Sequence, residues 1–271
     1  MVNFLSEDVI KKRDVNSWLY KLVVSGCIIV ILLMNTGCKN ETSGTLRIAI
    51  ASNLAEPITT LMERFEAESN IKTDIIIGSS GKHTAQIMHG APYDIFISAD
   101  TKYLDSLFKA GHLLETPKKF LEGSLILWSS KKSVMKGIEV LTNVEFEKMA
   151  IPNPTTAPYG IAAHEALENL GLWSKVQGKL VYGESVTQTN QFILTEAVQA
   201  GITSQSLIHS KQLDLSGKWI PLNTELHNPI QHGISILAST NKLADCQRLI
   251  QFLFSEASRS LLTEYGYKIS T

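Results

Sequence analysis

From Leu46 onward the chain alternates between short apolar runs typical of strands and longer segments whose apolar residues recur at helical spacing. The first run, 46–51, is followed by a helix face built from Ile58, Leu61, Met62 and Phe65. Further strand candidates lie at 73–77, 95–98, 124–129, 149–151, 179–182 and 230–238, and helix candidates include 185–200 and two helices within 241–265. Such alternation predicts an α/β fold with parallel sheets that helices cover on both faces.

Composition excludes several classes of protein. With 271 residues, of which 44% are hydrophobic and 19% charged, the chain has an ordinary globular balance. Its 25 Lys and Arg against 26 Asp and Glu give a net charge of -1, whereas a nucleic-acid-binding protein normally carries a basic excess. A mean hydropathy of +0.05 is too low for a protein with several membrane spans.

The N-terminus has the layout of a bacterial export signal. Basic residues precede an apolar run at 22–34, and the sequence Asn-Thr-Gly-Cys ends this segment at Cys38. A Cys directly after Gly resembles a lipobox, so we predict an export signal over 1–38, lipidation of Cys38 and a polar tether over 39–44. An uncleaved anchor helix is the alternative. Both interpretations put the rest of the chain in the periplasm or on the outer face of the cytoplasmic membrane.

The cysteine and histidine patterns do not indicate a disulfide or a metal site. Cys246 is the one cysteine left after residue 38, so no intrachain disulfide is expected. It shares helical spacing with Leu249 and Leu253, which predicts a core position in a helix rather than a nucleophile. The seven His lack metal-site spacing, and we predict that His227 and His232 are surface residues.

Four turns from strand to helix share hydroxyl-bearing, aromatic or small residues, at 52–53, 78–81, 157–160 and 184–187. In parallel sheets, ligands bind beyond the carboxyl ends of the strands, where such turns gather. The first N–H groups of a helix are unpaired and lie at the positive end of its dipole. Several converging helix starts therefore make an anion site without Lys or Arg. Ordinary N-capping is the alternative explanation for each turn.

Other motifs in the sequence do not indicate an enzyme. The segment 79–82, Ser-Ser-Gly-Lys, fits the Ser-x-x-Lys of penicillin-recognising acyl enzymes, but their Ser-Asp-Asn and Lys-Thr-Gly motifs are missing from the sequence. The segment also fails as a P-loop, because Ile76 stands where Gly is required and His83 where Ser or Thr is required. Asp94 and Asp100 flank a buried-looking strand, and loop anchoring and capping explain them better than acid–base chemistry.

Several motifs, taken in order, resemble one family. They are 50–54 (Ile-Ala-Ser-Asn-Leu), 78–81 (Gly-Ser-Ser-Gly), 90–100 (Gly-Ala-Pro-Tyr-Asp-Ile-Phe-Ile-Ser-Ala-Asp), 153–173 from Asn-Pro to Leu-Trp, 179–181 (Lys-Leu-Val) and 265–267 (Tyr-Gly-Tyr). The chain resembles the molybdate-binding proteins of ABC importers from about Leu46 to its C-terminus, and the segment 90–100 is the most specific part of the resemblance.

The resemblance implies a two-lobed periplasmic binding protein, each lobe a mostly parallel sheet flanked by helices, with a hinge between them. Lobe 1 would comprise 45–123 and 230–271, and lobe 2 would comprise 124–229. The ligand would be molybdate or tungstate, delivered to an ABC permease in the cytoplasmic membrane. By position, the donors would be Ser52 with Asn53, Ser80, and the backbone at Tyr159 and Val186. We expect a monomer with no cofactor, no metal ligated directly by the protein, no nucleic-acid partner and no enzyme activity.

Two positions depart from the usual pattern of the family. Ser204 stands where the family often has a Tyr that reaches the ligand, so one donor is lost and Tyr159 is a candidate to replace it. Lys82 replaces a small or hydroxyl residue, and it either adds charge near the anion or faces solvent. Three alternatives stay open: a binding protein for sulfate or another oxyanion, a module that docks on a signalling receptor, and an exported two-lobed hydrolase that uses Ser79 or Ser80.

Overall fold

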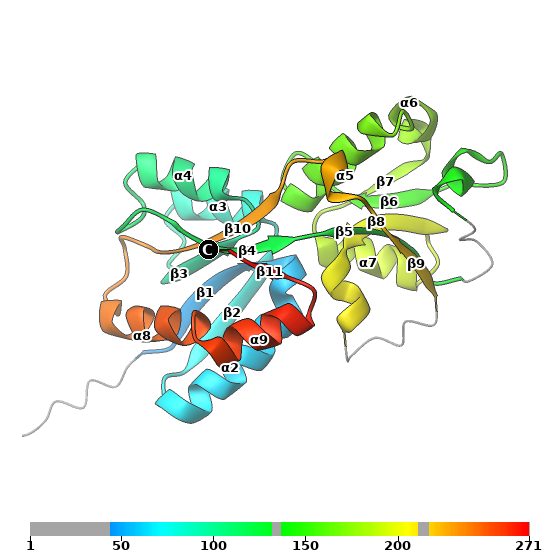
Figure 1. The fold of residues 1–271 in the computed structure, drawn as a ribbon. Helices are drawn as coiled ribbons and strands as arrows, with labels where there is room; N and C mark the ends of the chain where they lie inside the picture. Colours follow the sequence, from blue (N-terminus) through cyan, green and yellow to red (C-terminus); the bar gives the residue numbers. More distant parts are fainter. Residues whose placement is uncertain (1–43, 132–136, 211–216, 271) are drawn as a thin grey trace, which may run out of the picture. The chain divides into compact units, whose positions relative to one another are not determined.

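The computed structural model describes residues 44–131, 137–210 and 217–270 (Figure 1). The predicted export signal, the lipidation site at Cys38 and all of the predicted tether except Gly44 lie outside the described residues. Over the described ranges, no helix is long and apolar enough to cross a membrane.

The described residues form a first sheet with the strand order β11-β4-β10-β3-β1-β2 (Figure 1). Its strands are β1 (Leu46–Ala51), β2 (Thr73–Gly78), β3 (Ile95–Ser98), β4 (Lys118–Gly123), β10 (Ile230–Ile236) and β11 (Lys268–Ile269). β1 pairs in parallel with β2 and β3, whereas β10 is antiparallel to β3 and β4, and β11 is antiparallel to β4. The carboxyl ends of β1, β2 and β3 therefore meet at one edge of this sheet.

The second sheet has the strand order β7-β6-β8-β5-β9. Its strands are β5 (Leu125–Ser129), β6 (Met149–Pro152), β7 (Leu180–Gly183), β8 (Ala200–Ser204) and β9 (Lys218–Pro221). β6 pairs in parallel with β7 and β8, while β5 is antiparallel to β8 and β9. The chain crosses from the first sheet to the second at Ser124, between β4 and β5, and returns through 222–229, between β9 and β10.

Helices cover both faces of the first sheet (Figure 1). Side chains of α2 (Ala55–Ser69), α8 (Leu243–Leu253) and α9 (Glu256–Glu264) pack with Ile48 and Ile50 of β1 in one apolar cluster. Those of α3 (Ser80–Met88) and α4 (Thr101–Lys109) pack with Ala49 and Phe96 in another. Alternate residues of β1 thus point to opposite faces, which explains why 46–51 is an almost continuous apolar run.

The second sheet is covered in the same way. α5 (Pro158–Asn169) packs with Leu127 of β5 and Ile151 of β6, whereas α7 (Val186–Leu194) and η4 (Gln205–His209) pack with Ile126 and Ala150 on the other face. Shorter turns connect these elements: η1 (Ser52–Leu54), η2 (Ile138–Thr142), α6 (Trp173–Val176), η3 (Gln177–Lys179) and η5 (Thr224–Leu226). Two sheets, each flanked by helices, confirm the predicted α/β fold class. The expectation of mostly parallel sheets is wrong, because β10 and β11 pair antiparallel in the first sheet and β5 pairs antiparallel with both of its neighbours in the second.

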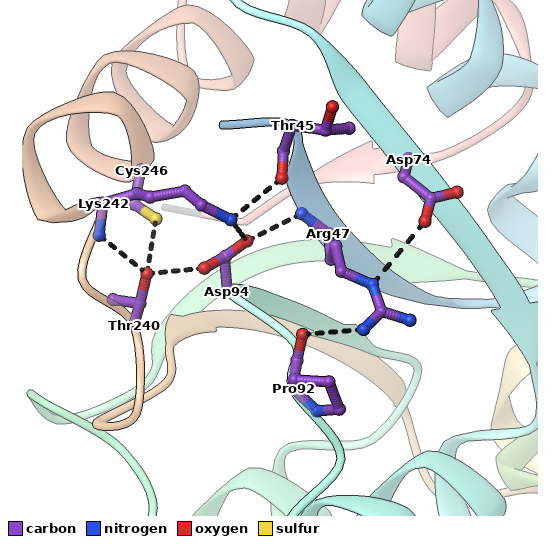
Figure 2. A network of polar contacts seen from close by, with 8 residues as sticks. All are labelled: Thr45, Arg47, Asp74, Pro92, Asp94, Thr240, Lys242 and Cys246. Carbon is purple, nitrogen blue, oxygen red and sulfur yellow. Dashed lines mark hydrogen bonds and ion pairs between the residues drawn. The ribbon is translucent and has the colours of Figure 1, made fainter. Parts of the chain in front are cut away.

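Asp94 anchors the loop before β3, as predicted (Figure 2). Its carboxylate accepts hydrogen bonds from the Arg47 backbone N–H at 2.8 Å, the Thr240 hydroxyl at 2.6 Å and the Lys242 ammonium at 2.9 Å. Burial raises the pKa of this carboxyl, but the three hydrogen bonds outweigh it and hold the pKa below its usual value. Asp100 caps α4 by accepting from the backbone N–H of Lys102 at 2.8 Å, which was also expected.

Three local predictions meet different outcomes. Cys246 is fully buried in α8, and this confirms its core position. The helix predicted over 185–200 ends at Leu194, because the chain turns at Glu196, which adopts a left-handed φ of 58°. The surface positions predicted for His227 and His232 are wrong, since their side chains are 7% and 0% exposed.

Candidate functional site

A small cavity lies where helix starts from both sheets meet. All five ligand-binding residues predicted from the sequence line it, namely Ser52, Asn53, Ser80, Tyr159 and Val186. Ser79 lines it as well. The cavity measures about 10 Å³, which is space for roughly one water molecule. The structure therefore brings the predicted residues together, although they come from four turns spread over more than half of the chain.

Each of these turns follows the carboxyl end of a parallel strand. β1 leads directly into η1 at Ser52, and β2 leads through Ser79 into α3. β6 leads into α5, where Pro158 occupies the first turn without needing a backbone donor. β7 leads into α7 at Val186. Parallel pairing within each sheet aligns these carboxyl ends, which is why residues far apart in the sequence share one cavity.

Ordinary N-capping explains only one of the four turns. Ser185 caps α7, since its hydroxyl accepts from the backbone N–H of Gln188 at 3.3 Å. At the starts of η1, α3 and α5, the capping residues make no side-chain hydrogen bond to the helix. The hydroxyls at Ser52, Ser79 and Ser80 therefore need another explanation than local capping.

Two of these hydroxyls accept hydrogen bonds from backbone groups across the cavity wall. The Val186 N–H, at the start of α7, donates to Ser52 Oγ at 3.1 Å and so links the two sheets. The Ala99 N–H donates to Ser80 Oγ at 2.9 Å. A hydroxyl oxygen that accepts in this way keeps its own proton for another acceptor. Ser52 and Ser80 are thus held in place while each retains a hydrogen-bond donor.

Ser79 is the residue that sequence reasoning undervalued. Its side chain is 3% exposed, and its hydroxyl has no hydrogen-bond partner among the described residues. A buried hydroxyl without a partner loses free energy relative to its hydrated state, so it calls for an explanation. Its place in the wall of the cavity supplies one, because a bound oxygen atom there would accept its proton. From the sequence, Ser79 belongs to one of the four anion-site turns, but it is named individually only as a possible nucleophile.

The cavity wall carries polar groups but no charge. Of the described residues that line it, none has an ionised side chain. The positive ends of the α3, α5 and α7 dipoles supply the favourable potential for an anion instead. Lys82 pairs with Glu184 across the two sheets, and the two side chains are 48% and 66% exposed. Lys82 is therefore an exposed residue at the rim and does not line the cavity.

Asn53 and Tyr159 reach from the cavity wall into a buried polar cluster with His232 and Tyr267. No local pattern indicates this cluster, because His232 lies 179 positions after Asn53. Ser204, which stands in place of the usual Tyr, does not line the cavity; its hydroxyl shares a hydrogen bond with that of Ser206 at 2.8 Å.

The neighbourhood of Ser79 and Ser80 lacks the base that a nucleophilic serine needs. His83 is close in sequence, but its Nε2 lies 3.1 Å from the Ile50 carbonyl and its Nδ1 lies 3.2 Å from Gln86 Oε1. Among the described residues, neither serine hydroxyl contacts a His, a Lys or a carboxylate. Burial lowers the pKa of His83 more than its hydrogen bonds raise it. The geometry fits binding better than acyl transfer.

Comparison with known proteins defines the class. The chain belongs to the bacterial extracellular solute-binding proteins, whose family model matches residues 46–268. Molybdate-binding protein ModA of Azotobacter vinelandii is 30% identical over 224 residues, 82% of this chain and 89% of that protein. ModA of Rhodobacter capsulatus is 27% identical over 226 residues, 83% of this chain and 88% of that protein. Among solved structures, the periplasmic molybdate-binding protein of Azotobacter vinelandii matches with a TM-score of 0.79 and 28% identity, over 83% of this chain and 100% of that one.

Proposed function

We propose that this protein captures a tetrahedral oxyanion, molybdate or tungstate, and delivers it to an ABC permease. The observation that carries the proposal is the unpaired, buried hydroxyl of Ser79 in an uncharged cavity where three helix N-termini converge. The names of the two relatives and of the matching structure support the choice of molybdate among oxyanions.

The donors fit an anion that carries no proton. Hydroxyls of Ser52, Ser79 and Ser80 and backbone N–H groups at Asn53 and Tyr159 can each point at an oxygen atom, and the Val186 N–H can do so once it leaves Ser52 Oγ. A tetrahedral dianion offers four oxygen atoms that only accept. Phosphate keeps a P–OH group at neutral pH, and this group prefers a carboxylate acceptor that the cavity wall lacks. Sulfate has no such proton, so cavity size has to discriminate against it.

Opening and closing of the two lobes would admit the anion. The predicted lobes, 45–123 with 230–271 and 124–229, each contain one sheet and two of the four turns. A cavity of about 10 Å³ holds roughly one water molecule, so the lobes have to separate for an oxyanion to enter and then close around it slightly less tightly than in this structure. The ligand then favours the closed form, because only there do donors from both lobes reach it.

The remaining properties follow from export. In our proposal the mature chain is a monomer that is attached by lipid at Cys38 to the outer face of the cytoplasmic membrane, close to its permease. It is a carrier and catalyses no reaction, since a site made of neutral donors binds and releases without chemistry. Mass spectrometry of the mature protein tests the anchor, and an intact Met1 would contradict it.

Calorimetric titration of the purified protein tests the function. We expect tight binding of molybdate and tungstate, weaker binding of sulfate and weaker still of phosphate. Elemental analysis of protein from molybdate-supplemented medium provides an independent measurement. The absence of heat and of any thermal shift with molybdate would refute the assignment, and phosphate that competes at equimolar concentration would refute the donor-only account of the site.

A further inference from the structure

Four buried polar side chains from distant parts of the chain meet beneath the anion cavity. They are Asn53 after β1, Tyr159 in the first turn of α5, His232 in β10 and Tyr267 before β11, and none is more than 6% exposed. We refer to these four residues as the floor cluster. Two of them, Asn53 and Tyr159, also line the cavity from opposite sheets.

Asn53 is at the centre of the floor cluster. Its Nδ2 lies 2.7 Å from His232 Nε2, 2.9 Å from the Tyr267 hydroxyl and 3.3 Å from the Tyr159 hydroxyl. The Tyr267 hydroxyl donates in turn to the Asn53 backbone carbonyl at 2.8 Å. The amide nitrogen is therefore engaged within the floor cluster, which leaves the backbone N–H as the donor that Asn53 can give to an anion.

His232 fixes this arrangement because it is neutral. Complete burial lowers its pKa to about 4, although hydrogen bonds to backbone carbonyls raise it slightly. Its Nδ1 lies 3.2 Å from the Ile230 carbonyl, to which the Nδ1–H donates. The lone pair on Nε2 is then free to accept from Asn53, and the tautomer is fixed by the strand itself.

Tyr159 brings the other sheet to the same place. Its hydroxyl lies directly over Gly123, the last residue of β4 before the chain crosses between the sheets. A Cβ at Gly123 would lie 2.0 Å from that hydroxyl and 3.0 Å from His232 Cε1, so only glycine leaves room. The His232 ring meets Tyr159 and Tyr267 edge-on, with centroids 6.0 and 5.5 Å apart.

We propose that the floor cluster sets the separation between η1 and the start of α5 across the cavity, and that His232 and Tyr267 are thereby positioning residues that determine which oxyanion fits. The inference rests on the proposed function and adds the origin of its size selectivity. Ser52 and the Asn53 N–H lie on one side of the gap and the Tyr159 N–H on the other. Without the 2.7 Å acceptor at His232, the two N–H groups of the Asn53 amide keep only the Tyr267 hydroxyl and the more distant Tyr159 hydroxyl at 3.3 Å, so the amide would turn toward Tyr159 and η1 would shift with it.

Two variants at one position separate the hydrogen bond from the packing. His232→Gln keeps an acceptor near the place of Nε2, whereas His232→Phe keeps a ring and removes the acceptor. His227→Phe is the matched control, since His227 is another buried histidine, five positions earlier, and its Nδ1 lies 2.7 Å from the Asn228 carbonyl rather than near Asn53.

Calorimetry on the full chain then gives the dissociation constants of molybdate and sulfate for each variant. We expect His232→Phe to reduce the preference for molybdate over sulfate by about tenfold, the factor that one hydrogen bond typically supplies. His232→Gln and His227→Phe should keep the wild-type preference within about twofold, whatever they do to thermal stability. Tyr267→Phe, which removes another partner of the Asn53 amide, replaces His232→Phe if the latter does not fold.

The outcomes distinguish this inference from the function on which it rests. A wild-type chain that binds molybdate, with a preference that neither His232→Phe nor Tyr267→Phe alters, overturns the inference alone. If His232→Phe and His227→Phe lose the preference for molybdate over sulfate to the same extent, the inference is overturned too, because any buried histidine then has this effect through packing alone. A wild-type chain that binds neither anion overturns both the function and the inference.

Discussion

The buried His232 predicts a specific dependence of stability on pH. Its pKa in the folded protein is about 4, against 6.5 for an ordinary His, because burial disfavours the charged form. Below pH 6.5 the unfolded chain therefore binds a proton that the folded protein does not. Stability contributed by this residue is lost as the pH falls from 6.5 towards 4, and the loss levels off below that.

The size of the effect follows from the two pKa values. Between pH 7 and pH 5 the linkage relation gives a loss of about 2 kcal/mol of unfolding free energy from His232 alone. The side chain is 0% exposed, so solvent screening does not reduce this figure. His83 acts in the same direction, since its pKa is lowered as well, but its contribution is common to wild type and to variants at 232.

Urea unfolding of wild type and His232→Gln at pH 7, 6 and 5 measures the difference. We expect the wild type to lose about 2 kcal/mol more than the variant over this interval, because glutamine has no proton to take up. The comparison uses the change with pH, so a constant offset in the stability of the variant does not matter. If wild type and variant lose the same amount of unfolding free energy between pH 7 and pH 5, the account of His232 as a buried neutral imidazole is refuted.

Three further changes test the site. Ser79→Ala should weaken molybdate binding by about tenfold. It should leave the unfolding free energy unchanged or slightly higher, because the hydroxyl has no partner to lose. Calorimetry measures the affinity and urea unfolding the stability, and a less stable variant with unaltered affinity would contradict this. Lys82→Glu and Glu184→Lys should each accelerate release of molybdate about two- to fivefold, because their exposed ion pair joins the two sheets. The double variant with the two charges exchanged should restore the wild-type release rate. Stopped-flow competition measures these rates, and a double variant that still releases faster than wild type would contradict the role of the pair. Gly160→Ala should cost about 1–3 kcal/mol of stability, because its Cβ would lie 2.2 Å from the Pro152 carbonyl oxygen, and thermal unfolding that matches wild type would contradict this.

Local patterns in the sequence predict most of the elements around the site. Apolar spacing locates β1, α2 and α8, and the cap at Asp100 places the start of α4. The rule that ligands bind beyond parallel strand ends then groups Ser52, Ser80 and Val186 in one place, and the structure puts them in one cavity. These features depend on neighbours a few residues away, so a single sequence contains them.

Other features depend on partners that only the fold brings close. β4, β9 and β11 carry polar residues or are very short, so they lack the apolar runs by which strands were predicted. His232 has the spacing of an ordinary strand residue, and its burial follows from contacts with Asn53 and Tyr159 at the crossing between the sheets. Ser79 could not be distinguished from a capping serine until the absence of a cap bond in α3 was seen.

The hydrogen bond from the Val186 N–H to the Ser52 hydroxyl has a consequence for closure without a ligand. A backbone donor buried without an acceptor makes closure of an empty pocket costly. In this closed arrangement the Val186 N–H is instead paired with the Ser52 hydroxyl of the other sheet at 3.1 Å. Closure without a ligand therefore costs little at this contact, and the ligand has to stabilise the closed form through donors that the empty pocket leaves unpaired, such as the Ser79 hydroxyl.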